Sequence, residues 1–120
     1  MNKHREAVAA YKEKKFPLGV LQIQSRSTGK IFLDGGLNLP ALENRHRFTL
    51  NLGTHPNRPL QADWNALGEA AFDFTIVAEI DRDPDHPDRD YRPDVAALLQ
   101  LWIEEKQPYG PAGYHEGALP

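Results

Sequence analysis

The chain has no cysteine among its 120 residues. This absence excludes a disulfide framework, a zinc ribbon and a cysteine nucleophile. The sequence also lacks an apolar run of about 18 residues and a charged leader before an apolar segment, so we expect neither a membrane span nor a secretory signal. We therefore expect one small cytoplasmic domain whose core folds without a metal or a disulfide.

Charge is unevenly distributed along the chain, although the net charge is only −3. Residues 1–58 hold 10 Lys and Arg against 4 Asp and Glu, whereas residues 59–120 hold 4 against 13. Clustered basic side chains neutralise phosphates, which dominate the affinity for nucleic acid. The basic half predicts weak nucleic-acid binding, provided that the acidic half faces away from the polyanion.

Helices are predicted where apolar residues recur every three to four positions or where Ala, Lys and Glu dominate. The predicted helices are 2–15, 39–52, 58–67 and 93–106. Asn38 and Asn57 are suited to cap the second and third, and Gly53 to end the second. The last helix is apolar around more than half of its circumference, so we expect it to lie deep in the domain.

Strands are predicted at residues 18–25 and 30–34, which form a hairpin ended by Gly35 and Gly36, and at 72–80. Phe72, Phe74, Ile76, Ala78 and Ile80 alternate with polar residues and are expected to face the core. These elements predict an α+β fold, a small three-stranded antiparallel sheet flanked by helices. We expect an extra N-terminal helix at 1–16, the domain at 17–106 and a loose, flexible tail at 107–120.

Several motifs at fixed spacing carry a resemblance to a known family. They are Gly19-Val20-Leu21, Gly29-Lys30-Ile31-Phe32-Leu33-Asp34, Gly53-Thr54-His55, Leu60-Gln61, Asp63-Trp64-Asn65 and Phe72-Asp73-Phe74. Over residues 17–106 the chain resembles the GIY-YIG nuclease family. The resemblance implies a three-stranded antiparallel sheet and divalent-metal-dependent phosphodiester hydrolysis.

The residues that the resemblance assigns to catalysis are apolar in this sequence. The two tyrosine positions hold Leu21 and Phe32, the arginine position holds Leu42, and the metal-holding glutamate position holds Leu99. Cleavage requires charge stabilisation at the phosphoryl group and oxygen ligands for Mg²⁺, and leucine supplies neither. We expect these four side chains to line one apolar patch that a partner protein or a second copy of the chain would cover.

The chemistry could instead have moved to neighbouring residues. Arg45 lies on the same helical face as Leu42, and Asp34 replaces the glycine that closes the second motif, with His46 and His55 nearby by analogy. In that alternative Asp34, His46 and His55 hold Mg²⁺ or Mn²⁺. In the simpler interpretation Arg45 is solvated, Asp34 forms a turn, and the histidines are hydrogen-bonded structural residues.

Other candidate sites have plain structural interpretations. The acidic stretch 81–90 resembles a calcium loop, but it has His86 at the sixth position and Arg92 at the twelfth, where Gly and Glu are needed. Five aromatic residues could stack on nucleic-acid bases, but their spacing on helices and strands favours core positions: Phe48, Trp64, Phe72, Phe74 and Trp102. Tyr109, Tyr114 and His115 have no evident role.

Our leading hypothesis is a catalytically degenerate GIY-YIG-like domain that acts as a binding module without a cofactor. Its partner would be another protein at the apolar patch, or nucleic acid at Lys30, Arg45, Arg47 and Arg58. A homodimer is a further possibility. The alternative is a residual DNA endonuclease that uses Mg²⁺ or Mn²⁺ with relocated catalytic residues.

Overall fold

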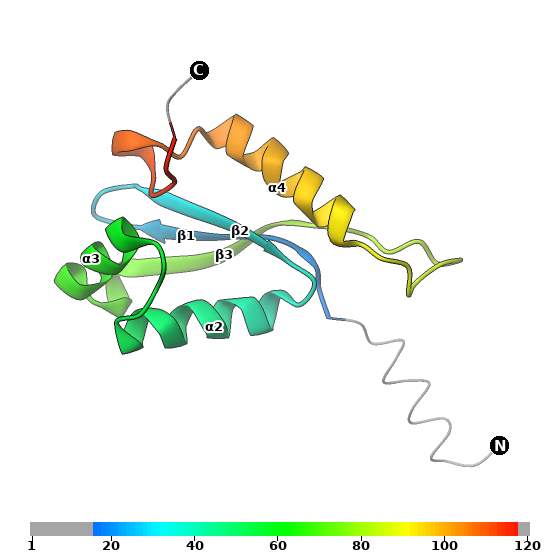
Figure 1. Cartoon of the computed structure of the whole chain (residues 1–120), viewed down its shortest axis with the longest axis horizontal. Helices are drawn as coiled ribbons and strands as arrows, with labels where there is room; N and C mark the ends of the chain where they lie inside the picture. Colours follow the sequence, from blue (N-terminus) through cyan, green and yellow to red (C-terminus); the bar gives the residue numbers. More distant parts are fainter. Residues whose placement is uncertain (1–15, 118–120) are drawn as a thin grey trace, which may run out of the picture.

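Three antiparallel strands form the centre of the molecule (Figure 1). The computed structural model describes residues 16–117, so the helix expected before Phe16 lies outside the described residues. The strands are β1 (Gly19–Ser25), β2 (Ile31–Gly36) and β3 (Phe72–Glu79), in the order β2-β1-β3. The expected three-stranded α+β fold is confirmed.

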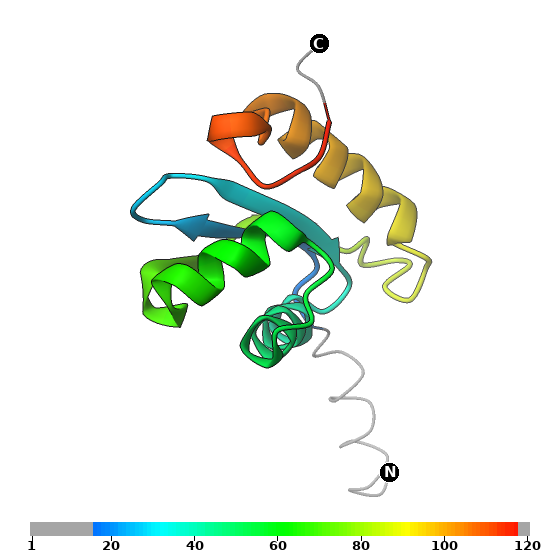
Figure 2. The same cartoon turned by 60° about the vertical axis from the view of Figure 1, so that its left-hand side comes forward.

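Helices cover both faces of this sheet. α2 (Leu39–Leu52) and α3 (Arg58–Leu67) lie on one face, and α4 (Arg92–Lys106) lies on the other, as Figure 2 shows. Two short 3₁₀ turns, Glu69–Ala71 and Gly110–Ala112, complete the elements. None of the helices in the described part of the chain has the length and apolar character needed to cross a bilayer.

The boundaries of α2 and α3 follow local capping signals. Asn38 Oδ1 accepts a hydrogen bond from the Ala41 amide at 3.1 Å, and Asn57 Oδ1 accepts one from the Leu60 amide at 2.9 Å. Gly53 ends α2 with φ of 83°, a left-handed conformation that glycine adopts without steric cost. The predicted ends of both helices are therefore confirmed.

The two faces of β1 serve two parts of the core. On one face, Ile23 packs with side chains of α2, α3 and β3, including Leu50 and Trp64. On the other face, Val20 packs with Leu33 beneath α4. Gly35 belongs to β2 rather than ending it, and a Cβ there would lie 2.7 Å from Val95 Cγ1, so glycine permits the close approach of α4.

The alternation predicted for β3 fails at Ile76, whereas Ala78 and Ile80 pack against the core as expected. Val20 pairs with Ala78, whereas Leu21 pairs with Ile76, so Val77 is an extra residue on β3. Such an insertion shifts the inward and outward pattern by one position. As a result Ile76 is 39% exposed, while Val77 and Ala78 pack toward α4.

Two expectations about burial are also wrong. α4 lies on one face of the sheet and is not enclosed, so Val95 is its only buried residue and Leu101 is 61% exposed. Phe48 was expected in the core, but it points away from the sheet on α2 and is 66% exposed. The other four aromatic residues contact the core or lie at its edge.

The segment expected to be a loose tail is part of the domain. Residues 108–117, here called the C-terminal strap, lie against the edge of β2 through a parallel bridge between Ile31 and Gly113. The Tyr114 amide donates to the Ile31 carbonyl at 3.0 Å, and the Tyr114 side chain is 2% exposed within the α2/α3 core. The strap thereby covers a strand edge that would otherwise be unpaired.

Candidate functional site

A chain of hydrogen bonds joins three of the candidate residues. His46 Nε2 lies 2.8 Å from Asp34 Oδ2, and His46 Nδ1 lies 2.9 Å from His55 Nε2. The Asn57 amide donates to His55 Nδ1 at 3.0 Å. Both histidines are buried, whereas Asp34 is partly exposed. The fold thus brings Asp34, His46 and His55 together, as the sequence predicted.

The direction of these hydrogen bonds follows from the backbone donor at one end. Because the Asn57 amide donates to His55 Nδ1, the proton of neutral His55 lies on Nε2 and is donated to His46 Nδ1. His46 then carries its proton on Nε2 and donates it to Asp34. Every nitrogen of the pair therefore has a partner.

Phe32 occupies the centre of a group of imidazole rings. Its ring centroid lies 5.5 Å from that of His46, 5.7 Å from that of His55 and 4.9 Å from that of His115, on which it stacks. His115 comes from the strap, and its Nε2 accepts a hydrogen bond from the Leu33 amide at 2.9 Å. Sequence reasoning missed His115, since only a contact across 82 positions places it here.

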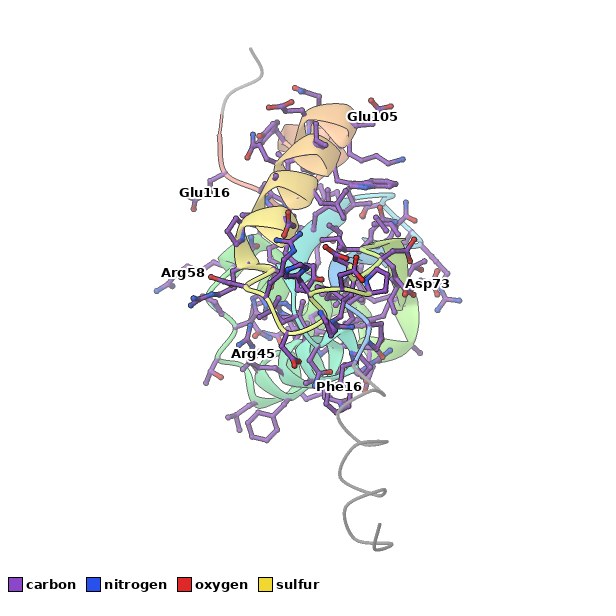
Figure 3. The ribbon with its side chains drawn as sticks, turned by 90° about the vertical axis from the view of Figure 1, so that its right-hand side faces the viewer. Phe16, Arg45, Arg58, Asp73, Glu105 and Glu116 are labelled. Carbon is purple, nitrogen blue, oxygen red and sulfur yellow. The ribbon has the colours of Figure 1, made fainter. Side chains whose placement is uncertain are left out.

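An open groove of about 610 Å³, here called the histidine groove, runs beside this network. It is lined by Phe32, Asp34, Arg45, His46, Thr49, His55, Pro56, Asn57 and Glu116. Arg45 and Glu116 lie on the same side of the molecule as Arg58 and opposite Asp73 (Figure 3).

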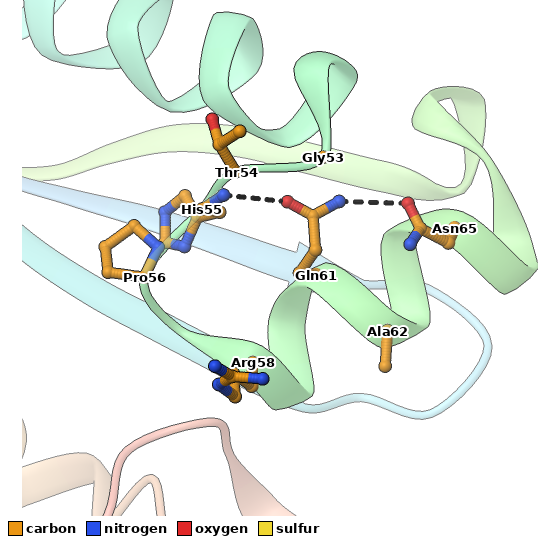
Figure 4. Close-up of a pocket in the computed structure, with 8 residues that line it drawn as sticks. All are labelled: Gly53, Thr54, His55, Pro56, Arg58, Gln61, Ala62 and Asn65. Atoms are coloured by element: carbon orange, nitrogen blue, oxygen red, sulfur yellow. Dashed lines mark hydrogen bonds between the residues drawn. The ribbon is translucent and has the colours of Figure 1, made fainter.

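A second groove, here called the Arg58 groove, adjoins the first at His55 and Pro56. Its volume is about 580 Å³, and Figure 4 shows the residues that line it, Gly53 to Pro56 and four from α3. Gln61 holds the loop between α2 and α3: its Oε1 accepts from the His55 amide at 3.0 Å, and its Nε2 donates to the Leu50 carbonyl at 2.9 Å. The two grooves thus share a loop of fixed shape.

The four basic residues predicted to bind nucleic acid differ in whether their side chains already have a partner within the protein. Arg47 pairs with Glu43 and Glu69, and its guanidinium lies 3.8 Å from the centroid of the Phe74 ring. Lys30 lies over the Tyr114 ring at 5.7 Å. Arg45 and Arg58 are exposed and form no ion pair within residues 16–117. These two arginines, one in each groove, are free to bind an anion.

Two solved structures share this architecture. The catalytic domain of the homing endonuclease I-TevI is 24% identical to the chain with a TM-score of 0.64, covering 81% of this chain and 95% of that one. A point mutant of the catalytic domain of the intron endonuclease I-TevI is 23% identical with a TM-score of 0.61, covering 75% and 84%. The fold is GIY-YIG-like. No protein-family model matches the sequence, and no curated protein matches it significantly.

Within this GIY-YIG-like fold the four apolar motif positions do not form an exposed patch. Leu21 and Leu42 are 1% and 7% exposed and pack with Leu39 between β1 and α2. Leu99 belongs to α4 and packs on the opposite face of the sheet, and Phe32 lies among the histidines. The prediction of one exposed docking patch is wrong, because these leucines pack within the domain on two different faces of the sheet.

The described residues do not fit the divalent cation that a GIY-YIG nuclease uses. A metal ligand needs a free lone pair, but His46 Nδ1, His55 Nδ1 and His115 Nε2 each accept a hydrogen bond. Asp34 accepts one hydrogen bond at each oxygen, from the Gly35 amide and from His46, and keeps further lone pairs, but none of these imidazoles beside it has a free one. Across residues 16–117, no three His, Asp or Glu side chains are placed to hold a metal ion.

Stability is expected to fall as the pH drops from about 7.5 to about 5.5. Burial and the neighbouring His46 lower the pKa of His55, and burial lowers the pKa of His115, both from an ordinary value of 6.5. The unfolded chain therefore takes up protons near pH 6.5 that the folded chain excludes, so the melting temperature decreases on acidification. Thermal melts followed by circular dichroism at several pH values measure this slope.

Two variants test whether the buried imidazoles cause this dependence of the melting temperature on pH. His115→Gln keeps an acceptor near the Leu33 amide but does not titrate, so we expect a shallower slope. His86→Gln, a change of an exposed imidazole in the loop before α4, is the matched control. A melting temperature that stays constant or rises toward pH 5.5 would contradict the hydrogen-bond directions given above.

Proposed function

We propose that the protein is a catalytically degenerate GIY-YIG-like domain that binds nucleic acid without cleaving it. The observation that carries this proposal is the burial of Leu21 and Leu42, at 1% and 7% exposed, where the resemblance expects polar catalytic groups. Loss of one electrostatic stabiliser commonly lowers a rate by about a hundred- to thousandfold. Here a tyrosine and an arginine position have both become part of the core.

The geometry of the histidine chain supports a structural role over a relocated catalytic one. A general base or a metal ligand needs an imidazole nitrogen whose lone pair faces substrate or metal. In His46 and His55 each lone pair faces a donor inside the protein. We infer that the chain Asp34-His46-His55 fixes the loop between α2 and α3 against β2.

The two available arginines support nucleic acid as the partner. Arg45 and Arg58 lie in adjoining grooves, and phosphate contacts from such side chains supply most non-specific affinity. The fold is compatible with nucleic-acid binding. A protein partner at the leucine positions is disfavoured, since Leu21 and Leu42 are inside the domain.

The protein is expected to shift supercoiled plasmid in a gel at about 50 mM salt but to leave it uncut with Mg²⁺ or Mn²⁺. The Arg45→Ala/Arg58→Ala double variant should weaken the shift, and its slope of log affinity against log salt should be shallower by about 2. Arg92→Ala, an exposed arginine paired with Asp90, serves as the matched control. Metal-dependent cleavage that disappears in Arg45→Ala would instead identify a residual endonuclease.

A further inference from the structure

The outer side of α2 carries an exposed row of side chains. This row, here called the α2 ridge, consists of Ala41, Asn44, Arg45, Phe48 and Leu52. Phe48 and Leu52 are 66% and 63% exposed, which makes them the two most exposed large apolar side chains of residues 16–117. No capping, core contact or ring contact within the described residues accounts for the Phe48 ring.

The α2 ridge is continuous with the histidine groove. Arg45 belongs to both, and Thr49 of α2 lines the groove one turn further along. Residues three positions apart on a helix have Cβ atoms about 5–6 Å apart, so Arg45 and Phe48 are neighbours on the outer side of α2. The exposed Asn44 amide lies four positions before Phe48 on the same side. One exposed side of α2 therefore carries an aromatic ring, a guanidinium and an amide, and it meets the histidine groove at Arg45.

This combination matches unpaired nucleotides better than a duplex. Bases in a duplex are paired and stacked on one another, whereas a single strand presents base faces on which an aromatic ring can stack. Tight duplex binding relies on many phosphate contacts, of which a typical protein makes about 6–10. The grooves offer two unpaired arginines, and residues 59–120 carry 13 acidic residues against 4 basic ones.

We propose that the histidine groove and the α2 ridge bind a single-stranded nucleic acid, with a base stacked on Phe48 and the flanking phosphates held by Arg45 and Arg58. This inference rests on the proposed nucleic-acid binding. Stacking of one base on an aromatic side chain changes affinity by about 5- to 150-fold. Stacking on Phe48 thus adds affinity to the phosphate contacts of the two arginines, and it does so for any base.

Fluorescence anisotropy with labelled oligonucleotides tests the proposal. The probes are oligo-dT and oligo-U of about 12 nucleotides and a DNA duplex of the same length, at about 50 mM salt. We expect the single strands to bind more tightly than the duplex, and Phe48→Ala to weaken their binding by about 5- to 150-fold. Phe48→Trp should restore it. The DNA and RNA probes establish which sugar the site prefers.

Controls separate this inference from the proposed function. Leu101→Ala truncates an equally exposed apolar residue on α4, behind the sheet, and should leave binding unchanged. Single-strand binding that depends on Arg45 and Arg58 but not on Phe48, or tighter binding of the duplex, would overturn the stacking proposal and leave nucleic-acid binding intact. No binding of any probe would overturn both. A dimeric mass in light scattering that Phe48→Ala makes monomeric would show that the ridge is an interface between two copies.

Discussion

Replacing Tyr114 with alanine is expected to lower the free energy of unfolding by about 3–5 kcal/mol. The side chain is 2% exposed and packs in one cluster with Ile23, Leu60 and Trp64. Its hydroxyl donates to Asp63 Oδ2 at 2.7 Å, and burial together with this bond raises the pKa of Tyr114 to about 12. The substitution removes a large part of the core and the anchor of the strap at the same time.

Urea denaturation followed by tryptophan fluorescence measures this effect, because Trp64 lies in the same cluster. Tyr114→Phe keeps the ring and loses one hydrogen bond, which should cost about 0.5–1.5 kcal/mol. Glu116→Ala, an exposed change in the same strap, should stay within about 0.5 kcal/mol of the parent. A Tyr114→Ala protein within 1 kcal/mol of the parent would show that the strap contributes little to folding.

The parts of the fold that sequence reasoning predicted correctly depend on local signals. Asn38, Asn57 and Gly53 act within one helical turn of their own position, so the ends of α2 and α3 can be read from neighbouring residues. The three strands were found in the same way, from apolar alternation and turn residues.

The parts that it missed depend on partners far away in the chain. The strap has no periodicity, and its place is set by Gly113 meeting Ile31 and by the Tyr114 ring entering the core. The extra residue Val77 shows only in the pairing of β3 with β1. A single sequence carries no signal for either contact, because neither leaves a repeating pattern.

For the candidate site, the sequence predicted proximity but not the roles of the residues. The resemblance grouped Asp34, His46 and His55, which the fold joins at 2.8 Å and 2.9 Å. Which nitrogen donates and which accepts depends on the Asn57 amide, a backbone group that no residue type reveals. The same limit hid His115, whose partner is the Leu33 amide.

Leu42, which stands where the resemblance implies a catalytic arginine, is part of the core beside α2. Leu42 points between β1 and α2, where it contacts Leu21 and Leu39, and a Cβ placed on Gly36 would lie 3.1 Å from its Cδ2. Packed in this way, the Leu42 position leaves no room for water or a phosphate. Restoring the polar residue should therefore cost stability before it could restore chemistry.

Leu42→Arg, which reinstates the arginine implied by the family resemblance, is expected to destabilise the fold by about 3–5 kcal/mol. The substitution leaves a charge without a partner among apolar side chains, and it removes a leucine that is 7% exposed. Leu42→Met conserves the volume and should cost less than about 1.5 kcal/mol. Phe48→Arg places the same charge on the outer side of the same helix and should change stability by about 0.5 kcal/mol or less. Urea denaturation of the three variants measures these differences.

A Leu42→Arg protein that is as stable as the parent and cleaves plasmid with Mg²⁺ would contradict this expectation. It would show that the site is still open, and that the proposed loss of catalysis can be reversed by one residue.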